Sequence, residues 1–263
     1  MFASLKNNMQ LIDTHTHLYL PEFDQDRDQI IKSAIDNNVQ KMLLPNIDST
    51  TIKPLLELVR KYPSNCFPMM GLHPTSVQEN DNKEMDIIES WLNKEHFIAI
   101  GEIGMDLYWD KTFKQQQEDV FRRQLGWAKK YNLPVVIHAR ESFDEIFKII
   151  GEEIDEQLTG VFHAFTGDND QATQIIDWGF KIGVGGIVTF KNAGLDKVIR
   201  NIDINHIVLE TDSPYLAPVP KRGKRNQSAY VKHIAEKIAL IKDISVEEVA
   251  QKTTNNAKQL FKL

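Results

Sequence analysis

The sequence predicts an α/β fold, a (β/α)8 TIM barrel with an additional C-terminal helix. Eight short apolar runs of strand length alternate with longer segments in which apolar residues recur every three or four positions. The 263 residues are also close to the roughly 250 that such a barrel needs. A doubly wound parallel sheet uses the same alternation and is the alternative fold. Because we find no long linker, low-complexity segment or repeat, we expect residues 1–263 to form a single domain.

Each predicted strand is a short apolar run. In chain order, the runs are 11–13, 39–44, 66–72, 97–100, 134–137, 159–162, 180–184 and 206–209. Helical spacing between them is clearest at positions 30–35 and 120–128. Ser142 and Ser245 are each followed three residues later by glutamate, the capping-box pattern of a helix start. The second start predicts the additional C-terminal helix.

Composition limits the classes of function. No stretch approaches the roughly 20 apolar residues that cross a bilayer, and residues 1–6 lack the apolar core of a secretion signal. We therefore expect a cytoplasmic protein without a membrane partner. Cys66 is the one cysteine, which excludes a disulfide framework and a cysteine-rich zinc site. We expect its side chain to be buried and apolar in character.

The net charge of −6 argues against a broad nucleic-acid-binding face, so any phosphate binding should be local. One basic cluster occupies residues 221–225, in a segment too rich in proline and glycine to be helical. It is either a solvated loop or, because it follows the eighth strand, a substrate contact at the barrel mouth.

Polar residues gather where the predicted strands end, and these ends share one mouth in a barrel. His15 and His17 lie two residues apart, which places their Cβ atoms on one strand face about 7 Å apart. Alone, such a pair is either a metal site or a hydrogen-bonded pair. The other polar strand ends favour a metal site; they are His73, Glu102, His138, His163 and Asp212.

Six segments containing these residues resemble TatD-type metal-dependent deoxyribonucleases, a family of amidohydrolase-like TIM barrels. The segments are 11–18, 71–74, 101–106, 134–140, 163–167 and 210–218. The resemblance implies a two-metal hydrolase of phosphodiesters. It implies that His15 and His17 bind one ion and His138 and His163 the other, that Glu102 bridges them, and that Asp212 is a further ligand beside the attacking water.

The chemistry of the residues agrees with that assignment. Glu102 and Asp212 cancel only two of the four positive charges of two divalent ions, so a phosphate would fit the site. Ions about 3.5–4 Å apart can lower the pKa of water and stabilise the attacking and leaving oxygens. Asp212 would orient the water and accept its proton. Imidazole ligands suit zinc, manganese or iron, whereas nucleases often use magnesium, so the metal stays open.

Contacts to substrate are less determined by the sequence. His73 resembles the family residue that approaches the scissile phosphate, or it supports a neighbouring ligand. Arg140 holds a phosphate oxygen or pairs with Glu141. Arg225 could follow a nucleic-acid backbone. The family pattern Arg-Asn-Glu-Pro here reads Arg-Asn-Gln-Ser over residues 225–228, so this loop lacks the acid and the proline of that pattern.

Three further features have two interpretations each. Asp13 orients a ligand imidazole or is a buried cap. The pair Tyr108 and Trp109 stacks an exposed base or packs on the adjacent helix. The glycine-rich segment 183–186 lacks dinucleotide-binding spacing and is expected to be a strand-end turn.

The resemblance predicts a DNase with 3′–5′ exonuclease action on single-stranded or frayed DNA, with no obligate protein partner. A binuclear-metal hydrolase of a small phosphoester, amide or lactone is the alternative. A noncatalytic metal-binding adaptor is the third possibility, disfavoured because Glu102 and Asp212 are both present.

Overall fold

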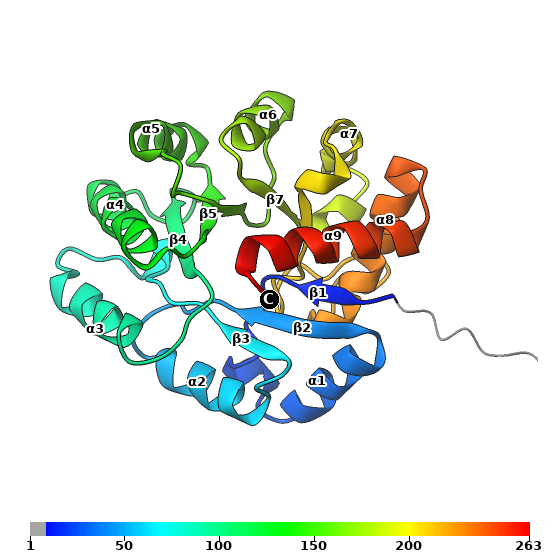
Figure 1. The fold of residues 1–263 in the computed structure, drawn as a ribbon, viewed down its shortest axis with the longest axis horizontal. Coiled ribbons are helices and arrows are strands. Elements are labelled where there is room, and N and C mark those ends of the chain that lie inside the picture. Colours follow the sequence, from blue (N-terminus) through cyan, green and yellow to red (C-terminus); the bar gives the residue numbers. More distant parts are fainter. Residues whose placement is uncertain (1–8) are drawn as a thin grey trace, which may run out of the picture.

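The strands form a ring surrounded by helices in the computed structural model, which describes residues 9–263 (Figure 1). The expectation drawn from residues 1–6 lies outside the described residues. Within residues 9–263, eight strands pair in parallel as two sheets, ordered β1-β2-β3 and β4-β5-β6-β7-β8. Their bounds are β1 Leu11–Asp13, β2 Val39–Leu44, β3 Cys66–Pro68, β4 Ile100–Asp106, β5 Val135–Arg140, β6 Gly160–Phe162, β7 Lys181–Val184 and β8 Ile207–Leu209.

Backbone hydrogen bonds join the two sheets at both seams. At the first seam, the amide of Thr14 donates to the carbonyl oxygen of Leu209 at 2.9 Å, and Thr16 forms a parallel bridge with Ser213. At the second seam, Met70 bridges to Ile100. The predicted barrel is therefore confirmed, with β1 next to β8.

Helices cover the outside of the ring. Their bounds are α1 Arg27–Asp36, α2 Ile52–Lys61, α3 Asn82–Leu92, α4 Lys114–Tyr131, α5 Phe143–Glu153, α6 Asn169–Asp177, α7 Leu195–Asn201, α8 Val231–Lys242 and α9 Val246–Phe261. Figure 1 shows α1 to α8 around the rim and α9 lying across the ring. None of the helices within residues 9–263 is long and apolar enough to cross a membrane.

Alternating strand residues build two apolar layers. On β5, Val135 and Ile137 pack outward against the helices, whereas Val136 packs inside the ring. Ala257 and Phe261 of α9 belong to the same inner cluster as Val136. Thus α9 closes one end of the barrel with apolar side chains.

The end that α9 closes is the N-terminal end of the strands. The hydroxyl of Thr254 donates to the carbonyl oxygen of Gln10, just before β1, and the amide of Asn256 donates to that of Ile207 at the start of β8. The C-terminal strand ends, where the polar residues were predicted to gather, are left on the opposite side.

Three predicted elements differ in detail. The third strand was predicted at 66–72 but covers only Cys66–Pro68. The fourth strand was predicted at 97–100 but runs over Ile100–Asp106, because the buried polar residues Glu102 and Asp106 lie inside it and end the apolar run early. Both serine-marked helix starts are confirmed. Ser245 caps α9 by accepting from the amide of Glu248, whereas Ser142 donates its hydroxyl to the carbonyl oxygen of Met105 and makes no cap bond.

Gly104 allows β4 to approach the strand that bears His138. Its φ is +133°, and a Cβ atom at this position would lie 2.2 Å from the carbonyl oxygen of His138. A side chain there requires both a strained backbone and a shift of β5.

We therefore expect Gly104→Ala to lower the free energy of unfolding by about 2–4 kcal/mol, measured by urea denaturation. The matched control is Gly126→Ala at an exposed position of α4, where the added Cβ meets nothing within 4 Å. The control should be neutral or stabilise the protein by about 0.5–1 kcal/mol. Equal stabilities for the two variants would contradict the proposed close approach.

Candidate metal centre

The carboxylate of Glu102 lies at the centre of the C-terminal strand ends, and imidazoles face both of its oxygens. The side chain is buried, and it comes from the middle of β4. Imidazole nitrogens lie near its Oε2 atom at 3.0 Å (His15 Nε2) and 3.7 Å (His17 Nε2), and near its Oε1 atom at 2.7 Å (His138 Nδ1), 3.3 Å (His73 Nε2) and 3.3 Å (His163 Nε2). A carboxylate with nitrogens on both oxygens has the arrangement of a bridging ligand.

Electrostatics keep this carboxylate charged. Burial favours the neutral acid, but the imidazoles of His73, His15 and His163 and the hydrogen bond from His138 outweigh it and lower the pKa of Glu102 well below its usual value. The predicted position of Glu102 among the histidines is thus reproduced by the geometry.

Asp212 approaches from the β1–β8 seam. Its backbone has a φ of +55°, and its amide donates to the carbonyl oxygen of His15 at 2.9 Å. Its Oδ1 atom lies 3.6 Å from Nε2 of His17 and 3.9 Å from Nε2 of His15. The ligand atoms of these three residues all lie within 4.8 Å of one another, which is close enough to share one ion.

The outer nitrogens of three histidines face oxygen atoms. Nε2 of His138 lies 3.0 Å from Asp106, and Nδ1 of His163 lies 3.0 Å from Glu210. Nδ1 of His17 is 3.1 Å from the hydroxyl oxygen of Tyr19, whose own proton is donated to the carbonyl oxygen of Pro45 at 2.6 Å. In His17 and His138, a proton on this outer nitrogen leaves the inner nitrogen with a lone pair that faces the centre of the site.

These inward lone pairs are the test of whether the residues fit metal ions. Lone pairs on imidazoles repel the negative oxygens of a carboxylate unless a cation lies between them. Burial and the neighbouring His163 lower the pKa of His15, which favours the neutral, ligating form. The donor set of imidazole nitrogens and carboxylate oxygens fits a divalent ion of the zinc or manganese type.

The charge around His163 also fits a divalent ion. Burial lowers its pKa, but the carboxylates of Glu210 and Glu102 outweigh burial and raise the pKa to about 10. This part of the site therefore stabilises positive charge, which a divalent ion would supply in place of the imidazole proton.

His73 presents a different group to the site. The amide of Thr75 donates to its Nδ1 atom at 3.1 Å, so the ring proton lies on Nε2, 3.3 Å from Oε1 of Glu102. His73 therefore offers an N–H donor to the site. Its ligand atoms also group with those of Glu102 and His138.

The predicted ligands fall into groups by the distances between their ligand atoms, and their allocation to two ions stays a prediction. Three groups of ligand atoms lie within 4.8 Å of one another among the described residues: His15, Glu102 and His163; His15, His17 and Asp212; and His73, Glu102 and His138. The His15 and His17 pair thus gathers with Asp212. That His138 and His163 share one ion stays a prediction.

Asp13 and Arg140 were each given two interpretations; the structure places Asp13 in the capping role, and the contact of Arg140 with a phosphate stays a prediction. Asp13 accepts hydrogen bonds from the amide and the hydroxyl of Thr211, at 2.8 and 2.6 Å. It therefore caps the segment at the β1–β8 seam and does not orient a ligand imidazole. Burial raises the pKa of Asp13 to about 7. Arg140 places its guanidinium carbon 3.9 Å from the centre of the Tyr108 ring. It stacks on an aromatic ring at the mouth.

Arg225 contacts the chain itself. Its guanidinium pairs with Asp26 at 2.6 Å, donates to the carbonyl oxygen of Glu22 and lies 4.5 Å from the centre of the Phe23 ring. The loop that departs from the family pattern is held by Asn226, whose amide donates to the carbonyl oxygens of Thr211 and Tyr215. The predicted contact of Arg225 with substrate stays a prediction.

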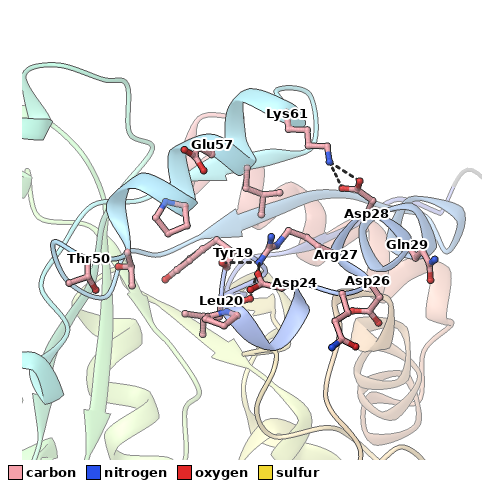
Figure 2. A pocket seen from close by; sticks show the side chains of 15 residues that line it. Tyr19, Leu20, Asp24, Asp26, Arg27, Asp28, Gln29, Thr50, Glu57 and Lys61 are labelled. Atoms are coloured by element: carbon pink, nitrogen blue, oxygen red, sulfur yellow. Dashed lines mark hydrogen bonds and ion pairs between the residues drawn. The ribbon is translucent and has the colours of Figure 1, made fainter.

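Tyr19 connects the metal centre to a neighbouring cleft of about 780 Å³. Figure 2 shows this cleft beside α1 and α2, with Tyr19 in its wall. Its charged side chains are paired with one another: Arg27 with Asp24, and Lys61 with Asp28. Arg27 and Lys61 are the two basic residues in the lining of this cleft, and both are already paired, so the cleft does not suit a phosphate backbone.

Sequence reasoning missed Asp106, Glu210 and Tyr19. Each was detectable by parity, because it lies an even number of residues from a predicted ligand: Asp106 four after Glu102, Glu210 two before Asp212, and Tyr19 two after His17. A prediction that extended the fourth strand to residue 106 would have identified Asp106 as a residue of the site.

Known proteins resemble this chain over nearly its whole length. A family described as TatD related DNase matches residues 12–262. An uncharacterized metal-dependent hydrolase of Bacillus subtilis, YabD, is 38% identical over 254 residues, which is 96% of this chain and 99% of that protein. The similarly described YcfH of Escherichia coli is 35% identical, covering 96% of each chain.

A solved structure agrees with these relatives. The TatD homologue YjjV of Escherichia coli superposes with a TM-score of 0.91 at 27% identity, over 97% of this chain and 99% of that one.

We expect Glu210→Gln to weaken metal binding about 10–100-fold, because the carboxylate that orients His163 is lost while the side-chain shape is retained. Competition with a chromophoric chelator measures the affinity. Asp110→Asn is the control, since that carboxylate is exposed and bonds within its own loop to Thr112. Unchanged affinity in Glu210→Gln would show that His163 needs no carboxylate partner.

Proposed function

Since the chain belongs to the family of TatD-related DNases and is a metal-dependent hydrolase, we propose that it hydrolyses phosphodiester bonds of DNA. We further propose 3′–5′ exonuclease action on single-stranded or frayed ends, with DNA as the partner and no obligate protein partner. A cytoplasmic location remains the expectation from composition. The observation that carries the proposal is Glu102, with inward imidazole nitrogens on both carboxylate oxygens.

Two divalent ions bound here, whether zinc, manganese or magnesium, would supply a nucleophilic hydroxide near neutral pH and stabilise the charge on attacking and leaving oxygens. Glu102 would hold the pair through its two oxygens. His15 and His17 would bind on one side, and His138 and His163 on the other.

Asp212 is the proposed proton acceptor. Although burial opposes its charged form, the hydrogen bond with His17 and the nearby imidazoles lower the pKa of this carboxyl, so it is ionised at neutral pH. It is slightly open to solvent, unlike the fully enclosed Glu102. Asp212 can therefore orient a water molecule and take its proton.

His73 and Arg140 are the proposed phosphate contacts. The Nε2–H group of His73 points into the site and can donate to a phosphate oxygen. Arg140 ends β5 two residues after His138, on the same face of the strand, and offers a permanent positive charge at the mouth. Together these donors favour a phosphoester over an uncharged amide or lactone.

A small phosphoester is the second candidate substrate. The observation that favours it is the scarcity of free positive charge: the chain carries −6 overall, and Arg225 is already paired with Asp26. A long strand requires more phosphate contacts than a small ester does.

One assay separates these candidates. We expect chelator to abolish hydrolysis and added zinc, manganese or magnesium to restore it. End-labelled single-stranded DNA should yield a ladder that shortens from the 3′ end, faster than the matched duplex or RNA. Cleavage of bis(p-nitrophenyl) phosphate without any cleavage of DNA would favour the small-ester alternative, and full activity in metal-depleted protein would exclude the metal mechanism.

We expect Asp212→Asn to lower kcat about 10²–10⁴-fold, because the amide cannot accept the proton of the attacking water. Asp36→Asn, an exposed carboxylate at the end of α1, is the control and should retain wild-type turnover. Circular dichroism checks that both variants fold. A rate for Asp212→Asn close to that of the control would remove Asp212 from the mechanism.

A further inference from the structure

Two large aromatic side chains lie exposed beside the metal centre. Tyr108 is 49% exposed and Trp109 is 70% exposed. Their rings meet edge to face, with centroids 4.9 Å apart. The sequence allowed either packing on the adjacent helix or stacking with a base, and this exposure leaves an indole face available to a ligand.

Arg140 completes this cluster. Its guanidinium carbon lies 3.9 Å from the centre of the Tyr108 ring and 5.2 Å from that of Trp109. Stacking of this kind holds the guanidinium plane against the ring while its N–H edge remains able to donate. We call Tyr108, Trp109 and Arg140 the rim cluster.

The rim cluster is tied to the metal centre through Asp106. One oxygen of this carboxylate accepts from the amides of Tyr108 and Trp109 at 3.0 and 3.4 Å, and the other lies 3.0 Å from Nε2 of His138. Arg140 and His138 also share one face of β5, where residues two apart are separated by about 7 Å. A ligand bound at His138 would therefore reach the cluster within the length of one nucleotide.

The chemistry of the cluster matches one class of ligand. An exposed indole offers a flat surface to a nucleobase, and the stacked guanidinium offers donors to a phosphate. A small phosphoester without a base would contact the guanidinium donors but would not use the indole surface. Within a chain of net charge −6, a compact aromatic and cationic cluster can retain a single strand without a broad basic surface.

We infer that the rim cluster is the subsite for the nucleotide next to the scissile phosphate, with its base stacked on Trp109 and its phosphate held by Arg140 on its Tyr108 support. This inference rests on the proposed nuclease function and adds to it a base-dependent contact with single-stranded nucleic acid.

The test compares two strands and three proteins. A fluorescein-labelled oligothymidylate of five nucleotides and the same strand without bases are titrated into chelator-treated protein, so that no hydrolysis occurs. We expect wild-type protein to prefer the base-bearing strand, and Trp109→Ala to weaken its binding about tenfold and to reduce the preference. Trp109→Phe, which keeps an aromatic face, should recover part of the preference.

The control removes an exposed apolar side chain elsewhere. Leu240 on α8 is 79% exposed, and Leu240→Ala should bind both strands as wild type does. Tryptophan emission supplies a second readout, because stacking on Trp109 should quench it on saturation with the base-bearing strand but not with the base-free strand.

Two results would overturn the inference. The first is a wild-type protein without preference for the base-bearing strand; the second is a Trp109→Ala variant that loses affinity for both strands equally. Hydrolysis of the same oligothymidylate with added metal is scored separately. Base-dependent binding without cleavage would overturn the nuclease function alone, whereas cleavage without a Trp109-dependent preference would overturn the rim cluster alone.

Discussion

The site depends on a negative carboxylate that is held away from water among imidazoles. Burying an ionised group is costly unless compensating charge lies close to it. For Glu102, imidazoles from several strands surround both oxygens, and a bound metal would add positive charge there. The ring of strands therefore does more than support the ligands, since only a closed ring brings the β1, β4, β5 and β6 ends to one point.

A second layer of oxygen atoms determines what each histidine can do. Asp106 and Tyr19 each face the outer nitrogen of one ring, that of His138 and that of His17, and can accept or share a proton there. The backbone amide of Thr75 donates to the outer nitrogen of His73 and leaves the proton of that ring facing inward. The proposed difference between a metal ligand and a phosphate donor would thus follow from the neighbour of each ring, while the residue type stays the same.

The sequence was sufficient for the features that repeat along the chain. Most strands were predicted close to their observed places, although the third was predicted to run to residue 72 and ends at Pro68. The i, i+2 spacing of His15 and His17 was expected to place both rings on one strand face; both residues instead follow the end of β1, where their rings face the same oxygen of Glu102. The fourth strand was predicted too early because a buried charge inside a strand breaks the apolar pattern. Contacts between distant segments could not be predicted from local sequence patterns. The pairing of Arg225 with Asp26 joins residues 199 positions apart, and no local pattern reveals such a pair. The role of Asp13 likewise depended on where Thr211 lies.

The closure of the barrel by α9 has a consequence for how the protein is made. The inner core needs Ala257 and Phe261, and the seam beside His15 needs the segment around Leu209. During synthesis, the first two ligand histidines emerge long before the chain that completes their surroundings. The N-terminal strands therefore cannot complete their packing until the C-terminal segments have been synthesised, as in other folds that depend on contacts between distant parts of the chain. Over that interval, a partly made chain can display imidazoles to passing ions, but it lacks Asp212 and so the group proposed to take the proton from water. Hydrolytic competence would consequently arise late in synthesis, when the segment that carries Asp212 has joined the barrel.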